Sequence, residues 1–508
     1  MPRESTFKPL LFTTTLRNPE RLKWFMAVLK NYNKQDLTDD LAEEIAGEII
    51  RIGLYKPTRL SDAVKRKIKA KEPLTDREVA KVLHDNPQNH KEAGFSKGWP
   101  SRFDTWFKIA KELGFVFYRA CEKIQFSGIG LKLVESEHSE FEQQAFLNAF
   151  VKYQSNNPFR RVRNENVPLI LLLEVISKLN ADRDFNGTGI SKLELPLVIY
   201  WKDNDAEKLF QRIKKLREDF RFIPSWEAVS DICRNEIMEG QDIVRDNKSI
   251  MVDYPDEFIR KMRLTGLISL RGGGRFIDIN KKEQDKVNYV LENYSAYKKY
   301  DTEKTYFKYI STVDSKLISF VPKQVSMFKQ NEILAKWVRI YSWESIKKEL
   351  LNLSKGQLTK DEILKYLSNP IRLEFLIALA VKSKFPKVKV IPKYPVDDEG
   401  LPTATAGGVG NNGDIECFEK ENGILIEVTM SEGRTQTMME VWPISRHLAE
   451  FSKKADNSMC YFVAPSIFSD SMKQIQYVKQ TENLSISPKT IEEFLVQLEN
   501  NTALYSEQ

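Results

Sequence analysis

An acidic residue inside an otherwise apolar β-like run constrains this chain more than any other feature of its sequence. Glu427 lies in the run 424–430 (ILIEVTM), where the positions on its N-terminal side suit a buried strand. Burying a carboxylate costs several kcal/mol unless a cation or hydrogen bonds compensate for the lost water. The run therefore predicts a strand that carries a functional charge.

A second β-like run, 414–418 (DIECF), precedes the first, with Asn422-Gly423 between them. Asn-Gly between two such runs favours a tight hairpin, which makes Asp414 and Glu427 neighbours on adjacent strands. Two carboxylates and the backbone carbonyl of Val428 are hard oxygen ligands that suit Mg²⁺, for which Mn²⁺ could substitute. Such a metal activates water and stabilises a leaving oxygen, so the hairpin predicts phosphodiester hydrolysis.

The hairpin resembles the PD-(D/E)xK nuclease motif, in which an Asp and a Glu on neighbouring strands hold the metal. The sequence departs from that motif at two positions. Gly413 stands where the motif has proline, and Thr429 stands where it has lysine. Without that lysine, the charge-stabilising role of its ammonium must be filled elsewhere or left to the metal.

Further polar residues surround the hairpin. Gln436 and Glu440 are four positions apart and share a face if the segment is helical, while His447 follows on the same predicted helix. Glu374 lies on a predicted helix, 372–382, ahead of the strands and could supply another carboxylate. The alternatives are a solubilising surface charge for Glu374 and capping or packing roles for Gln436 and His447.

The N-terminal part of the chain, roughly the first 290 residues, is predicted to be mostly helical. The segment 74–83 begins with Thr75 as N-cap and Glu78 three residues later, a capping-box pattern. A helix over 102–113 is followed by two β-rich arms around Ser127–Gly130. This order of helix and then hairpin is the plan of a winged helix.

The same plan recurs further along the chain. A helix is predicted over 255–264, with Pro255 in its first turn. Two short β segments then flank the turn Arg271–Arg275, which contains three glycines. The pattern predicts a second winged-helix-like element.

Basic residues near these elements are candidates for contacts with DNA phosphates. A solvated hairpin tip and surface salt bridges are the alternatives. The candidates are Arg17, Arg21, Lys261, Arg263, Arg271 and Arg275.

The length of 508 residues exceeds what one hydrophobic core organises, so several domains are expected. We predict DNA-recognition subdomains over 1–145 and 146–290, a helical linker over 291–368 and a nuclease domain over 369–508. The fold class is thus multidomain. It has a mainly α N-terminal half with winged-helix-like elements, and a C-terminal α/β core of PD-(D/E)xK type.

Composition excludes some classes of protein and is neutral about others. The net charge of +7 permits a polyanionic partner without demanding one. Four scattered cysteines without a CxxC pair, and only four histidines, argue against a zinc site and indicate a reduced, cytoplasmic chain. The N-terminal residues contain no long apolar run, and the segment 168–175 (PLILLLEV) is too short to span a bilayer and is predicted to form a buried helix. No membrane partner is therefore expected.

The run 413–450 (GDIECFEKENGILIEVTMSEGRTQTMMEVWPISRHLAE) resembles the catalytic segment of the AlwI-type restriction endonucleases, a group that includes strand-nicking enzymes. Residues 12–21 (FTTTLRNPER) resemble the opening of that group, and 265–280 (TGLISLRGGGRFIDIN) resemble the wing of its recognition region. The resemblance covers most of the chain, is specific at the catalytic segment and is weaker between 285 and 370. Thr429 in place of lysine is shared with the group.

This resemblance implies that Asp414 and Glu427 bind the metal. Glu374 and Glu440 complete the site, with Gln436 and His447 as further members. It also implies an N-terminal region that reads a short asymmetric site in double-stranded DNA and a C-terminal domain that cuts a few base pairs away. Cutting both strands would need a transient homodimer or a second subunit.

The sequence leaves two other functions open. One is a winged-helix DNA-binding regulator with a non-catalytic C-terminal oligomerisation domain, which leaves the acidic residue in ILIEVTM unexplained. The other is a repair nuclease that selects DNA by structure instead of sequence. The favoured prediction is a Mg²⁺-dependent, site-specific deoxyribonuclease of type IIS-like character.

Overall fold

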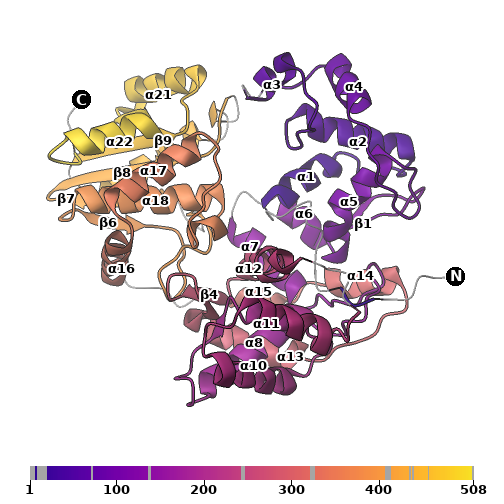
Figure 1. Ribbon diagram of the computed structural model, residues 1–508. Coiled ribbons are helices and arrows are strands. Elements are labelled where there is room, and N and C mark those ends of the chain that lie inside the picture. Colours follow the sequence, from indigo (N-terminus) through magenta and orange to yellow (C-terminus); the bar gives the residue numbers. More distant parts are fainter. Residues whose placement is uncertain are drawn as a thin grey trace. The chain divides into compact units, whose positions relative to one another are not determined.

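The computed structural model describes residues 6–8, 20–69, 72–135, 139–241, 246–320, 327–406, 413–433, 436–437, 440–455 and 457–505. The chain forms two compact units (Figure 1). Unit 1 comprises Met1–Ser136 and Phe141–Val321, and unit 2 comprises Glu137–Glu140 and Pro322–Gln508. The predicted linker, 291–368, is therefore divided between the two units, and the predicted boundary at residue 145 falls inside unit 1.

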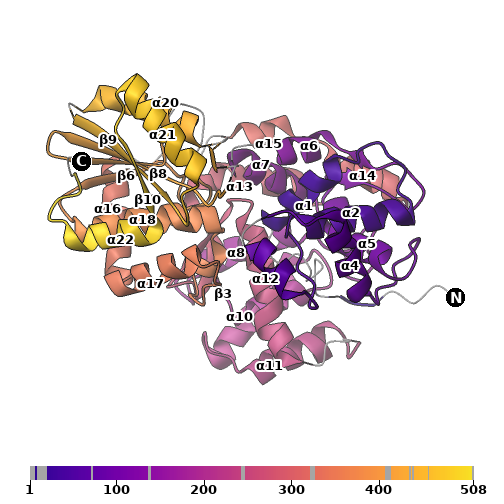
Figure 2. The ribbon, with the colours of Figure 1, turned by 90° about the horizontal axis from the view of Figure 1, so that it is seen from above.

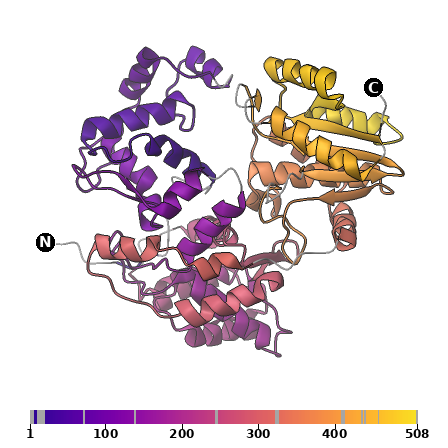
Figure 3. The ribbon, with the colours of Figure 1, turned by 180° about the vertical axis from the view of Figure 1, so that it is seen from behind.

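Unit 1 is mainly helical, as predicted. Its α-helices are α1 (Glu20–Lys30), α2 (Asp39–Arg51), α3 (Asp62–Lys69), α4 (Asp76–Asp85), α5 (Trp99–Glu112), α6 (Gly128–Glu135), α7 (Ser139–Phe150), α8 (Pro168–Ala181), α9 (Leu195–Tyr200), α10 (Ala206–Phe220), α11 (Trp226–Asp231), α12 (Tyr254–Arg263), α13 (Gln284–Tyr294), α14 (Glu303–Ser311) and α15 (Ser315–Ser319). Figures 2 and 3 show them from above and from behind.

Local sequence signals account for several of these helices. Thr75 caps α4, and its capping box with Glu78 is present. Pro100 and Pro168 each occupy the first turn of a helix, where a missing N–H costs nothing. The apolar residues of α8 are buried, which confirms the buried helix predicted from PLILLLEV. The helix ends were thus encoded locally, and burial then fixed the helices in place.

The first predicted wing, around Ser127–Gly130, is wrong. Strands β1 (Val116–Phe117) and β2 (Gln125–Phe126) do pair, but the chain turns between them, and α6 begins directly after β2. The Ser127 hydroxyl accepts a hydrogen bond from the Gly130 N–H and donates to Gly114 O at 2.7 Å. A Cβ on Gly130 would lie 2.0 Å from Phe115 O. These residues therefore start a helix pressed against the backbone and do not form a hairpin turn.

The second predicted hairpin is present. Helix α12 leads to β4 (Ile268–Arg271), which pairs antiparallel with β5 (Phe276–Ile279). A third strand, β3 (Ile190–Ser191), completes a sheet in the order β3-β5-β4. Its two residues were too few to give a periodic signal in the sequence.

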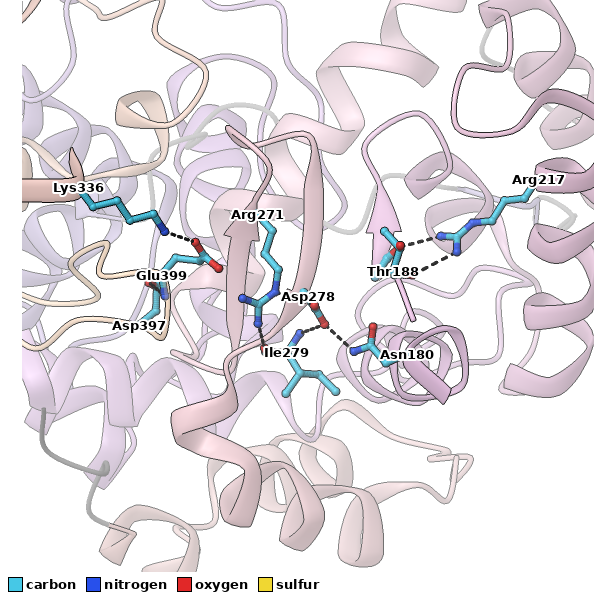
Figure 4. A network of polar contacts seen from close by, with 10 residues as sticks. Asn180, Thr188, Arg217, Arg271, Asp278, Ile279, Lys336, Asp397 and Glu399 are labelled. Carbon is cyan, nitrogen blue, oxygen red and sulfur yellow. Dashed lines mark hydrogen bonds and ion pairs between the residues drawn. The ribbon is translucent and has the colours of Figure 1, made fainter. Parts of the chain in front are cut away.

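A fully buried ion pair anchors the start of β3. The Arg217 guanidinium donates to both oxygens of Glu194, at 2.8 Å each, and neither side chain is exposed. The same guanidinium donates to the carbonyls of Thr188 and Gly189, at 3.1 and 2.7 Å, and Figure 4 shows it reaching Thr188. Arg217 thus joins α10 to the strand that the sequence did not reveal.

Unit 2 is built around a five-stranded sheet in the order β10-β9-β8-β7-β6. The strands are β6 (Lys389–Pro392), β7 (Ile415–Glu419), β8 (Asn422–Val428), β9 (Asn457–Ala464) and β10 (Ile486–Thr490). Neighbours from β6 to β8 are antiparallel, whereas β9 runs parallel to both β8 and β10. This mixed α/β arrangement agrees with the predicted C-terminal class.

Helices cover both faces of the sheet (Figure 2). The α-helices of unit 2 are α16 (Met327–Ile340), α17 (Trp343–Ser354), α18 (Asn369–Lys384), α20 (Val441–Phe451), α21 (Ser469–Glu482) and α22 (Ile491–Asn500). Helices α20 and α21 lie on one face, where Leu425 and Phe462 of the strands pack against Leu448 in a buried core. Helices α18 and α22 lie on the other face.

The hairpin between β7 and β8 turns earlier than predicted. Glu419 pairs with Asn422, so Lys420 and Glu421 form the two-residue turn, and Lys420 has a φ of 58°. Asn422 and Gly423 are instead the first residues of β8. The predicted strand pairing holds, because the register depends on the apolar pattern of both strands. Within the described ranges, no helix is both long and apolar enough to cross a membrane.

Candidate active site

The strand register places Asp414 opposite Glu427. Ile415 pairs with Ile426, so the preceding and following residues face each other across β7 and β8. The Val428 N–H donates to Asp414 Oδ2 at 2.8 Å. Glu427 is 6% exposed, whereas Asp414 remains partly accessible at the end of its strand.

Burial and mutual repulsion disfavour the charged forms of these acids. Burial raises the pKa of Glu427 well above its usual value, and the nearby Glu440 raises it further. Burial and then the charge of Glu427 raise the pKa of Asp414 in the same way. Two adjacent carboxylates that resist ionisation are the arrangement that a divalent cation would relieve.

Glu374 belongs to the same group of acids. It lies on α18, is 4% exposed, and accepts a hydrogen bond from the Ala406 N–H at 2.7 Å. Burial raises its pKa well above the usual range, and Asp414 and Glu427 add to the shift. The structure therefore brings Glu374 toward the hairpin and does not leave it as an exposed surface charge.

Glu440 and His447 approach from the segment that follows β8. Glu440 Oε1 accepts a hydrogen bond from the Thr429 hydroxyl at 2.8 Å. His447 Nδ1 lies 2.9 Å from Glu427 Oε1. Burial and the neighbouring Arg446 lower the pKa of His447, which favours the neutral ring. At this distance the neutral ring and the carboxyl group are hydrogen-bonded, which fixes the orientation of the carboxyl group.

Gln436 is brought near these residues, but its side chain is used in the fold. It is fully buried, and its amide nitrogen donates to the carbonyls of Ser431 and Ser466, at 3.0 and 2.9 Å. Its amide oxygen accepts from the Phe468 N–H at 2.9 Å. Gln436 therefore ties the segment after β8 to the segment after β9, which favours the structural role over the chemical one.

Gly413 explains one departure from the nuclease motif. A Cβ at this position would lie 2.3 Å from Glu427 Oε1 and 2.6 Å from Leu425 Cδ1. A proline or any other side chain would therefore collide with the carboxylate that the motif needs. Glycine lets the backbone pass directly beside Glu427.

The family model described as "AlwI restriction endonuclease" matches residues 111–366 and 341–497 of this chain. The chain belongs to the AlwI restriction endonuclease family. Membership makes it a nuclease of the restriction–modification type. No curated protein matches the chain.

Solved restriction endonucleases are also similar to this AlwI-family chain. The small subunit of the heterodimeric restriction endonuclease R.BspD6I is 22% identical, with a TM-score of 0.26, and the match covers 31% of this chain and 82% of that one. Free FokI gives 11% identity and a TM-score of 0.24, covering 95% of both chains. DNA-bound FokI gives 12% and 0.23, covering 98% and 97%. Because these TM-scores are low, the family match alone carries the assignment.

The residues present in this AlwI-family protein fit a magnesium ion. Asp414, Glu427 and the Val428 carbonyl offer three oxygen ligands, and Mg²⁺ commonly keeps several waters in addition to a few protein ligands. The chemistry of the donors is hard oxygen throughout. Across the described ranges, no three His, Cys, Asp or Glu side chains are arranged as ligands of one ion. A site of two carboxylates and a carbonyl does not require such a trio.

A further buried acid was not among the predicted site residues. Glu416, on β7, accepts ion pairs from Lys393 at 2.8 Å and Lys454 at 2.6 Å. Lys393 directly follows β6 and lies opposite Asp414, to whose carbonyl its N–H donates at 2.9 Å. The position of Glu416 within a β-like run was the signal that could have identified it. Its two lysine partners could not be identified in this way, because they come from segments far apart in the sequence.

Most of the predicted DNA-contacting residues in the wing region are engaged within the protein. Lys261 is 1% exposed and pairs with Glu257, and Arg263 is also buried. Arg271 donates to Asp278 Oδ2 at 2.6 Å and to Ile279 O at 3.0 Å, which pins the hairpin (Figure 4). Neither Lys261 nor Arg263 presents its side chain at the surface, so the structure gives their predicted DNA contacts no support and these stay predictions.

The other three residues predicted to contact DNA differ in how far their side chains are engaged within the protein. Arg17 lies outside the described residues. Arg21 donates to Leu54 O at 2.6 Å, and its guanidinium lies 5.5 Å from the centre of the Phe25 ring. Arg275, at the turn between β4 and β5, is exposed. Arg275 is thus accessible at the predicted wing, and its contact with DNA stays a prediction.

Proposed function

We propose that this chain is a type IIS-like restriction enzyme that hydrolyses DNA phosphodiester bonds with a divalent metal, a few base pairs from a short asymmetric site. The pairing of Asp414 with Glu427 across two strands carries the proposal, because neither acid is compensated by a cationic side chain in the contacts described above. Membership of the AlwI restriction endonuclease family supports it. The enzyme is expected to use Mg²⁺, with Mn²⁺ as a substitute.

In this proposal, Asp414, Glu427 and the Val428 carbonyl hold the metal. When bound, the metal would polarise a phosphate oxygen and make an attacking water more acidic. His447 orients the Glu427 carboxylate through its Nδ1–H, and the Val428 N–H orients Asp414. Each metal ligand is thus held by a partner of its own.

Glu440 and Glu374 have different roles in the proposal. The Thr429 hydroxyl fixes one oxygen of Glu440, so the other oxygen can accept a proton from a water placed beside the metal. Glu374 adds negative charge behind Asp414 and strengthens the attraction for a cation. Thr429 therefore serves as a holder for Glu440 and not as a substitute for the missing ammonium.

The architecture is consistent with this assignment. In unit 2, helix α18, strands β6 to β8, helix α20 and strand β9 follow one another, with Asp414 just before β7 and Glu427 in β8, and this order supports the proposed PD-(D/E)xK core. In unit 1, helix α12 and the sheet β3-β5-β4 have the order of a winged helix. We propose that unit 1 reads the DNA and unit 2 cuts it.

The described residues of one chain hold one such site, so we expect each chain to cut one strand at a time. Double-strand cleavage would need a second copy or a different subunit. The similar R.BspD6I protein is named as the small subunit of a heterodimeric restriction endonuclease, which makes a second subunit a concrete alternative to a homodimer.

The test is cleavage of plasmid DNA by wild type, Asp414→Asn and Glu427→Gln, with Mg²⁺ and then with EDTA. We expect discrete products from wild type only when metal is present, and at least a roughly 10³-fold lower rate for both variants. Glu482→Gln, at an exposed position on α21, is the matched control and should cut normally. Run-off sequencing of both strands then gives the site, the offset and the strand preference.

Two results would redirect the assignment. Wild-type rates in Asp414→Asn would remove the proposed site. Metal-independent DNA binding without any cleavage would favour the winged-helix regulator, whereas cleavage confined to branched or damaged DNA would favour a repair nuclease.

A further inference from the structure

One short segment carries a net positive charge almost as large as the net charge of the whole protein. The stretch 56–71 contains seven basic residues and one acidic residue, a net charge of +6 beside +7 for the entire chain. The basic residues are Lys56, Arg59, Lys65, Arg66, Lys67, Lys69 and Lys71, and the acidic residue is Asp62. The rest of the chain is thus close to neutral.

The segment just before it has the opposite charge. Residues 36–50 contain six acidic residues and no lysine or arginine. These are Asp36, Asp39, Asp40, Glu43, Glu44 and Glu48. The charge in this part of unit 1 is therefore separated into two blocks, and an ordinary solvated surface would mix both signs.

The structure holds the basic block on the surface. Helix α3 is attached through Val64, which is 5% exposed, and through Ile68, which lies against Gly53. The side chains of Lys56, Arg59 and Arg66 are all exposed. One apolar stripe thus fastens the helix and leaves Lys65 and Arg66 facing water.

Few of these cations are neutralised by the protein. Lys67 pairs with Glu78 at 2.8 Å, and Lys65 makes an exposed pair with Asp62 at 3.2 Å. Within the ranges that the structure describes, Lys56, Arg59 and Arg66 have no ion-pair partner. Lysines four apart on a helix also repel each other, by about 0.2–0.5 kcal/mol per pair.

The helix dipole explains part of this pattern but not all of it. Asp62 in the first turn and Lys67 near the end of α3 interact favourably with the dipole. Lys56 and Arg59, however, precede the helix and gain nothing from it. A polyanion bound along the segment would neutralise all of these charges and release its own counterions.

We propose that α3 and the chain leading into it, residues 56–66, form a contact surface for the phosphate backbone of duplex DNA. This inference rests on the proposed function and adds a surface to it. The surface is expected to supply affinity without sequence preference, because phosphates look alike in every sequence.

The test compares wild type with the triple variant Lys56→Ala/Arg59→Ala/Arg66→Ala. Binding to a random-sequence duplex of about 30 base pairs is measured by fluorescence anisotropy without Mg²⁺, between about 50 and 200 mM KCl. The plot of log K against log salt has a negative slope. Each lost phosphate contact makes that slope less steep by about 0.9, so three lost contacts make it less steep by about 2.7. Plasmid cleavage at low salt should keep its kcat while KM rises.

A matched control removes three exposed lysines elsewhere, in Lys355→Ala/Lys360→Ala/Lys479→Ala. This variant should keep the wild-type slope. If the basic-segment variant also keeps the wild-type slope while wild type binds and cuts DNA, the contact surface is refuted and the nuclease stands. If wild type neither binds nor cuts duplex, the proposed function itself fails.

Discussion

Three neighbouring carboxyl groups, two buried and one partly accessible, make the metal-free protein sensitive to pH. The pKa values of Glu374, Asp414 and Glu427 are all raised, mainly by burial. The folded state therefore keeps protons that the unfolded chain has already lost. Stability from these groups is fully present below the unfolded pKa and is lost as the pH rises through the folded pKa.

We accordingly expect the Tm of metal-free wild type to fall as the pH rises from about 5 to 8, and Mg²⁺ to restore it at the upper end. In Glu427→Gln, the fall should be smaller and the restoration by Mg²⁺ weaker, because one of the repelling charges is gone. Thermal melts across this range, with and without Mg²⁺, measure both effects. A Tm in wild type that does not respond to Mg²⁺ at any pH would contradict a metal at these acids.

Gly413→Ala should damage catalysis without unfolding the protein. The new Cβ would have to displace the Glu427 carboxylate, and a shift of about 1 Å in a catalytic group can cost ~100-fold in rate. We expect a cleavage rate lower by roughly 10- to 100-fold, with an unchanged circular dichroism spectrum. Gly128→Ala is the control, since nothing lies within 4 Å of a Cβ added there.

For single residues, the sequence predicted the two acids that belong to its strongest pattern, the β-hairpin of apolar strands. An acid in an apolar run located Glu427, and the hairpin located Asp414. The bonding of Gln436 to Ser466 and Phe468 could not be predicted, because those partners lie about 30 positions away and only the parallel pairing of β8 and β9 brings them together.

Among the elements, those with a local start signal were predicted best. The capping box of Thr75 and the prolines at positions 168 and 255 mark helix ends that the structure confirms. Ser127–Gly130 was misassigned because a serine followed by glycines suits a turn and a helix start equally well. Contact with the Phe115 backbone, which is tertiary, decided between the two.

The hairpin β4–β5 gives a test in which its two arginines behave differently. Arg271→Ala removes hydrogen bonds to Asp278 and Ile279, so we expect a loss of about 1–3 kcal/mol in stability. Arg275→Ala should change stability by less than about 0.5 kcal/mol and lower the salt slope of DNA binding by about 0.9. Melting curves and anisotropy titrations separate the two effects. Equal destabilisation by both variants would mean that Arg275 is also structural.

On the scale of the whole chain, the sequence indicated several domains but not their division. The polar helices of 291–368 looked alike in composition, and composition does not say which core a helix packs on. In the structure, α14 returns to the N-terminal helices, where Glu303 pairs with Arg119 at 2.9 Å, whereas α17 packs on α18. The segment 291–368, which was predicted to be a linker, thus contributes helices to two separate cores.

Recognition and cleavage should be separable in the intact protein, because the proposed DNA contacts and the acids belong to different units. Glu427→Gln should lose cleavage and yet keep the wild-type salt slope for the random duplex. Anisotropy and plasmid assays on the same preparation test this. A large change in the salt slope in Glu427→Gln would show that the acids and the DNA contacts are coupled.

The acidic block at 36–50 and the basic block at 56–71 together make this end of unit 1 an electric dipole. In the field of a DNA rod, such a dipole feels a torque as well as a pull. A molecule arriving with the wrong side forward would be rotated during its approach, before any atom touches the duplex. More collisions would then be productive, and the time spent finding the right orientation would depend on ionic strength.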